Sequence, residues 1–254
     1  MSFWEITAII LAGFMAGTIN TIVGSGTLIT FPTLLFFGYP PVMANISNSL
    51  GLVPGGVTGA WGYRSELRSL GPMLRRLAPA SFVGSIIGAL LLLVLPAAAF
   101  EAIVPILILL ALVLVVLGPR LSRWAASHHV EAVTRGRWVA LILGVVFAGM
   151  YGGYFGAAQG VLLLGLMSIL LPLGLQQMNG IKNVLGAIVN FVAAMVFLIV
   201  DPSQVDWTIV LLVGIGSILG GLIGARIGKA MAPWVLRLVI VVVGVTAIIF
   251  LLVT

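Results

Sequence analysis

The chain has 254 residues, of which 61% are hydrophobic and only 7% are charged, and its formal net charge is +6. This composition leaves too little polar surface for a water-soluble domain and predicts a protein of the lipid bilayer. The chain has no cysteine, which excludes disulfides and thiolate metal sites. The alternation typical of a membrane β-barrel is absent, so the predicted fold class is all-α and polytopic.

Ten apolar segments follow one another along the chain, five in each half. In the first half we expect them at about 4–22, 26–38, 42–62, 73–95 and 100–118. In the second half we expect them at about 138–154, 160–174, 178–200, 207–228 and 233–253. The predicted organisation is therefore a first transmembrane repeat over 1–118, a basic cytoplasmic linker over 119–137 and a second repeat over 138–254.

The second segment of each half is short for a membrane span. It has about 13 to 15 residues, or roughly 20 Å as a helix, against about 30 Å of hydrocarbon. Each short segment either spans the bilayer or forms a re-entrant hairpin with the segment before it. A hairpin requires that protein or a water-filled cavity satisfies the loop backbone.

The two halves repeat one another at an offset of about 132 residues. The run Gly84–Ala89 returns as Gly216–Gly221, and Ala16-Gly17 with Gly24 returns as Ala148-Gly149 with Gly156. Such a duplication is typical of transporters built from two related halves, with the site between them. We expect the glycine pairs Gly84/Gly88 and Gly216/Gly220 to serve close helix packing.

The charged residues indicate the orientation of the chain. Eleven of the twelve Lys and Arg fall in three places: Arg64, Arg68, Arg75 and Arg76; Arg120, Arg123, Arg135 and Arg137; Arg226, Lys229 and Arg237. The acids Glu5, Glu101, Asp201 and Asp206 fall in the other polar gaps. By the positive-inside rule the basic gaps are cytoplasmic and both termini lie outside. The second half is then inverted relative to the first, an arrangement that allows alternating access by exchanging the conformations of the two halves.

Three further features of the chain indicate no additional function. No aromatic residues are interleaved with the basic ones, so we expect no nucleic-acid partner. His128 and His129 lie in the basic linker and are interpreted as incidental, so no metal and no cofactor are expected. The N-terminal segment lacks the basic n-region of a signal peptide, and we expect it to be retained.

The junctions before the short segments combine glycines with polar side chains. In the first half Asn20, Ser25 and Thr27 accompany Gly24 and Gly26; in the second half Tyr151, Tyr154 and Gln159 accompany Gly152, Gly153, Gly156 and Gly160. A helix that begins inside the membrane presents unpaired N–H groups and a positive dipole, both of which favour an anion. The alternative is that these glycines only allow close packing.

The third segment of each half supplies a second polar cluster. Asn45, Ser47 and Asn48 lie in the first half, and Asn179, Lys182, Asn183 and Asn190 in the second. Lys182 lies at least a turn inside an apolar segment, where a charge is expensive and indicates function. The alternative is that its ammonium reaches the cytoplasmic interface. Beside Asn179 and Asn183, that ammonium would suit an oxyanion.

The absent residue types exclude several functions. No Asp or Glu lies in the interior of a predicted span, since Glu5 and Glu101 are each the second residue of theirs, which argues against a carboxylate proton relay or sodium site. No paired carboxylates, Cys-His or Ser-His-Asp set, or H-E-x-x-H spacing is present, so no enzymatic activity is expected.

In these residues the chain resembles the sulfite exporter TauE/SafE family of bacterial membrane transporters. The resemblance covers nearly the whole chain. It rests on Gly24–Thr27 followed by Pro32, on Ala44–Ser49 after Gly38 and on the Gly84/Gly88 helix, each echoed in the second half. It implies transport of small sulfur-containing anions such as sulfite, sulfonates or related carboxylates. The chain departs from the family pattern at Ser25, Thr27 and Ala157–Gly160, where side chains replace some glycines and would alter a pocket directly.

The sequence therefore predicts an exporter of small anions in the bacterial inner membrane, working by alternating access. The alternatives are an anion channel of the same architecture, and a membrane enzyme or non-transporting partner subunit. The residues expected to bind substrate are Asn20, Ser25, Thr27, Asn45, Ser47, Asn48, Tyr151, Tyr154, Gln159, Asn179, Lys182, Asn183 and Asn190.

Overall fold

The computed structural model describes residues 1–126, 134–227 and 233–253, and within these ranges it contains helices and no strand. The all-α prediction is confirmed. His128, His129 and Lys229 lie outside the described residues. The helices are α1 (Phe3–Ile22), α2 (Thr27–Phe36), α3 (Pro41–Gly62), α4 (Arg64–Leu67), α5 (Gly71–Val94), α6 (Ala97–Ala126), α7 (Arg135–Tyr154), α8 (Gln159–Leu170), α9 (Leu175–Val200), the 3-10 helix η1 (Pro202–Gln204), α10 (Trp207–Ile227) and α11 (Pro233–Val253).

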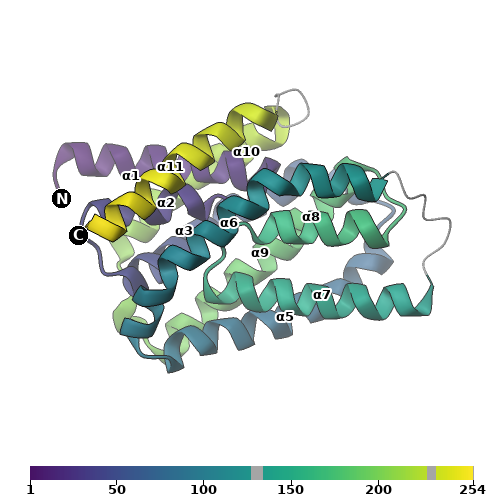
Figure 1. Ribbon diagram of the computed structural model, residues 1–254, viewed down its shortest axis with the longest axis horizontal. Coiled ribbons are helices and arrows are strands. Elements are labelled where there is room, and N and C mark those ends of the chain that lie inside the picture. The colour runs from purple at the N-terminus through teal and green to yellow at the C-terminus, as the bar shows by residue number, and fades with distance from the viewer. Residues whose placement is uncertain (127–133, 228–232, 254) are drawn as a thin grey trace.

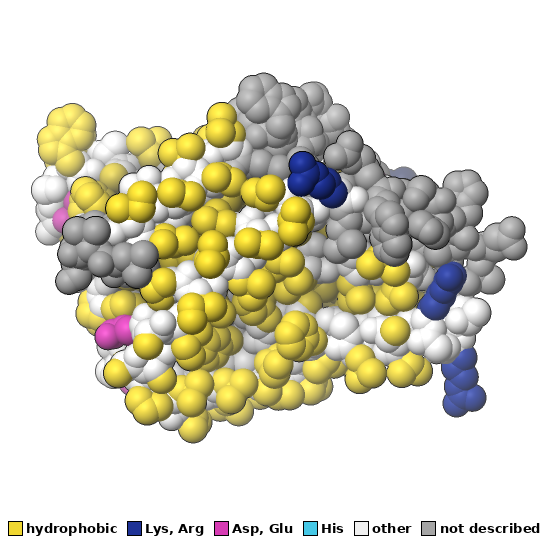
Figure 2. All heavy atoms as spheres, viewed as in Figure 1, with side chains coloured by type: hydrophobic (Ala, Val, Ile, Leu, Met, Phe, Trp, Pro, Cys, Tyr) yellow, Lys and Arg dark blue, Asp and Glu magenta, His cyan; other side chains and the backbone are white. Residues whose placement is uncertain are grey.

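Six helices of the described chain are long and apolar enough to cross a bilayer: α1, α5, α6 over Ala97–Gly118, α7, α9 and α10. This confirms a polytopic membrane protein. In Figure 2 hydrophobic side chains cover the middle of the visible face, with acidic side chains toward one end and basic ones toward the other. That distribution matches a bilayer crossed along the long axis of the molecule.

Local caps explain where several helices begin. Ser2 and Glu5 form a capping box at the start of α1. Thr134 caps α7 by accepting a hydrogen bond from the N–H of Arg137. At the start of α10 the N–H groups of Thr208 and Ile209 donate to Asp206 Oδ1, at 2.9 and 3.1 Å. These three helices thus begin at polar residues that flank the apolar segments.

The predicted fifth segment, at about 100–118, is shorter than the helix that contains it. Helix α6 continues to Ala126, into the basic stretch assigned to the linker. The apolar pattern stops earlier because only the part of a helix inside hydrocarbon must be apolar.

The short helix α2 forms a hairpin with α1, the helix before it. It has 10 residues, about 15 Å. Tyr39, just beyond its end, donates from its hydroxyl to Glu5 Oε1 at 2.7 Å, which ties the end of α2 to the start of α1. Burial, with Glu5 next in importance, raises the pKa of Tyr39 and keeps this phenol protonated. The chain therefore returns to the side from which α1 starts.

Helix α8 forms the matching arm in the second half. It has 12 residues, about 18 Å, and follows α7 after a short break. Figure 1 shows α2 in the half of the molecule that holds both chain termini and α8 in the opposite half. The two hairpins enter from opposite ends.

The two halves interlock through equivalent contacts. Helix α1 packs on α10, and its counterpart α7 packs on α5; α3 packs on α10, and α9 on α5. Each short helix contacts the last helix of the other half, α2 with α11 and α8 with α6. Helices α3 and α9 also pack on each other, so they form the central pair.

The paired glycines lie at the closest of these contacts. A Cβ atom at Gly88 would overlap the carbonyl oxygen of Met150 in α7, and one at Gly220 would overlap that of Phe14 in α1. The prediction that these glycines serve close helix packing is confirmed.

Candidate substrate site

The two helix breaks touch each other in the interior. Gly24, in the first break, and Gly160, at the start of α8, meet backbone to backbone, and the N–H of Gly160 donates to the carbonyl of Gly24 at 3.0 Å. A Cβ on either residue would overlap the Cα of the other. Gly24 also has φ +89°, a conformation that favours glycine. The breaks can cross this closely only because neither residue carries a side chain.

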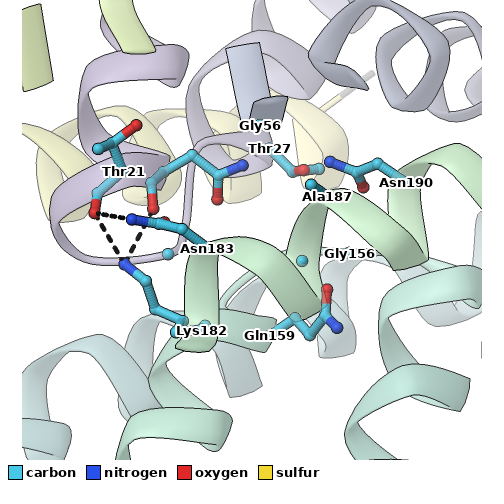
Figure 3. Close-up of a pocket in the computed structure, with 13 residues that line it drawn as sticks. Thr21, Thr27, Gly56, Gly156, Gln159, Lys182, Asn183, Ala187 and Asn190 are labelled. Carbon is cyan, nitrogen blue, oxygen red and sulfur yellow. Dashed lines mark hydrogen bonds between the residues drawn. The ribbon is translucent and has the colours of Figure 1, made fainter. Parts of the chain in front are cut away.

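A small polar cavity of about 20 Å³ lies beside this crossing (Figure 3). That volume has room for about one water molecule. Its walls come from the two breaks and from the central helices α3 and α9. They are formed by Asn20, Thr21, Gly24, Thr27, Gly56, Gly156, Gln159, Gly160, Lys182, Asn183, Gly186, Ala187 and Asn190.

Lys182 supplies the charged side chain among these residues, and it is 2% exposed. Its Nζ donates to the carbonyl oxygens of Asn20 at 3.1 Å and Thr21 at 3.0 Å, as the dashed lines in Figure 3 mark. Asn183 Nδ2 donates to the same Thr21 oxygen at 3.1 Å. These oxygens belong to the last turn of α1, where a cation favourably meets the negative end of the helix dipole. The ammonium therefore caps α1 at the wall of the cavity.

The other half makes the equivalent contact without a charge. Asn45 Nδ2, in α3, donates at 2.9 Å to the carbonyl oxygen of Tyr154, the last residue of α7. Each central helix thus caps the broken helix of the opposite half. Only the α9 side brings a formal charge to this contact.

Asn48 connects α3 to the start of α2. It accepts a hydrogen bond from the Thr30 hydroxyl and donates from Nδ2 to Thr27 Oγ1 at 3.4 Å. Thr27 lines the cavity, so Asn48 lies one hydrogen bond away from it. Asn48 therefore positions a cavity residue without itself forming the wall.

Two buried polar atoms near the crossing have no hydrogen-bond partner within the described part of the chain: Gln159 Nε2 and Ser25 Oγ. Gln159 is 5% exposed, lines the cavity and lies against Gly152, where a Cβ would overlap its side chain. Nearly all buried polar groups in proteins are hydrogen-bonded. The free amide of Gln159 is therefore available to a ligand.

The structure brings together six of the thirteen residues predicted to bind substrate. The cavity is lined by Asn20, Thr27, Gln159, Lys182, Asn183 and Asn190. The others, Ser25, Asn45, Ser47, Asn48, Tyr151, Tyr154 and Asn179, do not line it. Ser47, for example, accepts a hydrogen bond from the N–H of Asp206 at 2.9 Å and so connects α3 to the start of α10.

Sequence reasoning missed the small residues that α9 contributes to the wall. Gly186 and Ala187 lie one turn beyond Lys182 and Asn183 on the same face of α9, and Asn190 follows one turn later. The helical spacing of these residues could have identified that face. Thr21 was also missed, because it contributes a backbone carbonyl to Lys182.

A metal site finds no support in the described ranges, where no group of three His, Asp or Glu side chains is close enough to hold an ion. What the fold does present is a multi-pass helical membrane protein with two broken helices meeting at a buried polar cavity, an architecture used by secondary transporters. The chain belongs to the sulfite exporter TauE/SafE family, whose sequence model matches residues 9–251.

Several curated bacterial proteins are similar over most of their length. A protein named probable membrane transporter protein, from Haemophilus influenzae, is 28% identical over 91% of this chain and 88% of its own. Probable membrane transporter protein ORF9 of a Sinorhizobium species is 29% identical over 99% of this chain and 94% of its own. Probable membrane transporter protein YfcA of Escherichia coli is 28% identical over 90% of this chain and 82% of its own. No solved structure gives a significant match. The family and these names indicate a membrane transporter rather than an enzyme.

Proposed function

We propose that this protein exports small oxyanions, such as sulfite, sulfonates or related organic acids, from the bacterial cytoplasm across the inner membrane. The observation that carries the proposal is the Lys182 ammonium, buried at a cavity where two helix N-termini meet and where no wall residue is acidic. A buried cation beside the Gln159 amide, which has no hydrogen-bond partner in the described chain, favours an anion.

Alternating access follows from treating residues 1–118 and 138–254 as inverted repeats. Support comes from the equivalent contacts of the two halves and from hairpins that enter from opposite ends. With the basic end and the linker 119–137 in the cytoplasm, both termini lie outside. Exchanging the conformations of the two halves would then expose the cavity to one side and afterwards to the other.

Membrane voltage supplies a driving force for export. The cell interior is negative, and moving one negative charge outward is favourable by about 2.3 kcal/mol per 100 mV. The membrane voltage alone would therefore drive efflux through a uniporter that has no coupling ion. No coupling carboxylate lines the cavity, which fits this mechanism.

The proposal is tested by anion flux in proteoliposomes, with sulfite, sulfoacetate, thiosulfate and small carboxylates as candidate substrates. Lys182→Ala should lower flux to the level of empty vesicles, because it removes the charge at the cavity. Lys182→Arg keeps the charge and changes the geometry of the cation, so its anion flux shows whether geometry matters as well as charge. Arg75→Ala, which removes an exposed cation elsewhere, is the matched control and should keep wild-type flux. Normal flux by a correctly inserted Lys182→Ala variant would overturn the assignment.

An anion channel of the same architecture is distinguished by its conductance. The cavity here holds about one water molecule and forms no continuous pore by itself. Single-channel currents in planar bilayers would support the channel and contradict alternating access.

A further inference from the structure

The formal charge at the cavity follows from the ionisable side chains that line it. Among the residues that line the cavity, Lys182 is the one with an ionisable side chain. The position equivalent to Lys182 in the first half is Ser47, which is neutral and binds the N–H of Asp206. The duplication therefore placed one cation at the site rather than two.

The helix dipoles add little net charge to this cation. Helices α2 and α8 begin at the crossing and contribute about half a positive charge each, while α1 and α7 end close by and contribute about half a negative charge each. These contributions offset one another. The net charge presented to a ligand therefore does not exceed that of one ammonium.

The remaining cavity groups that can bind oxygen are neutral. Gln159 Nε2 is without a partner in the described chain, and Asn190 and Thr27 add a carboxamide and a hydroxyl to the wall. These groups can hold the oxygens of an anion but cannot neutralise a second charge. A second negative charge in a buried site without a counter-charge is strongly disfavoured.

We propose that the site prefers singly charged oxyanions to doubly charged ones of the same size. This inference rests on the proposed function and specifies its substrate class by charge. Selectivity arises because Lys182 compensates one negative charge, while the neutral donors recognise oxygen atoms without regard to the total charge.

The decisive comparison is between methanesulfonate and sulfate at pH 7. Each ion has five non-hydrogen atoms, but methanesulfonate carries one negative charge and sulfate two. Purified wild-type protein in proteoliposomes should take up methanesulfonate, or bind it in competition with a transported anion, more than about tenfold better than sulfate. Equal or better handling of sulfate would overturn the inference and leave the proposed transport function intact. Failure of every anion in the wider panel would instead overturn the proposed function.

A variant with a second cation supplies an independent test. Gln159→Lys should raise the ratio of sulfate to methanesulfonate uptake by about tenfold or more, because it adds the missing charge. Gln159→Met, of similar length and neutral, should lower both uptakes while preserving the preference for methanesulfonate. An unchanged ratio in a folded Gln159→Lys variant would contradict the inference. If that variant does not fold, the comparison of methanesulfonate with sulfate on the wild-type protein still tests the inference.

Discussion

Two oxygen atoms at the end of α1 hold the Lys182 ammonium in place, and both belong to the backbone. The sequence indicated Lys182 because a charge inside an apolar segment is conspicuous. Its partners could not be predicted, since every residue has a carbonyl and only the fold decides which carbonyls are left at a helix end. For the same reason Thr21 escaped prediction, while Asn183, one residue from Lys182, did not.

The crossing of the two breaks makes Gly24 a sensitive position. Gly24→Ala should lower the melting temperature and abolish transport, because the new methyl group meets the backbone of Gly160 in addition to the unfavourable φ. Gly38→Ala is the matched control: Gly38 has φ +83° but open space around it. The control should lose only about 1 to 2 kcal/mol of stability. Thermal unfolding followed by tryptophan fluorescence measures both variants, and equal losses would show that the crossing tolerates a side chain.

At the scale of helices, the apolar pattern predicted the elements well and their arrangement only in part. The second segment was expected at 26–38 and is observed as Thr27–Phe36, because apolar runs bounded by glycine determine where a membrane helix can form. The sequence left open whether this helix spans or re-enters. The contact between Tyr39 and Glu5, residues 34 positions apart, brings the end of α2 back beside the start of α1, and no local pattern encodes it.

The two hairpins make a testable prediction about sidedness. The chain has no cysteine, so single cysteines at exposed sites report their own side of the membrane. Ser2→Cys and Gly38→Cys should react with an impermeant maleimide from outside the cell. Gly136→Cys and Pro172→Cys should react only after the membrane is opened. If either pair divides between the two sides, the corresponding long and short helices do not return the chain to the side from which it started, and the predicted topology is wrong.

For the whole molecule, the described structure is closed around the site. Ser25 is fully buried and Gln159 is 5% exposed, so a reagent on either side should reach neither residue in this conformation. Alternating access requires that both become reachable in turn. The repeat in the sequence predicted two related halves, and the structure adds that they interlock.

Cysteines at positions 25 and 159 test this motion in the otherwise cysteine-free chain. During anion flux both should be labelled faster than at rest, and an impermeant reagent should label each from the inside and from the outside in different conditions. Ser2→Cys, exposed throughout, is the control and should be labelled at a constant rate. Rates at 25 and 159 that do not respond to a transported anion would indicate a static scaffold.

The interlocking of the halves also bears on how the chain assembles after it leaves the ribosome. Helix α1 is made well before α10, although α10 is its main neighbour. Until α9 arrives, the carbonyls at the end of α1 lack the Lys182 cap. Contacts between distant parts of a chain form slowly. The contacts of the first half with α9 and α10 can therefore be completed only after those two helices have been made.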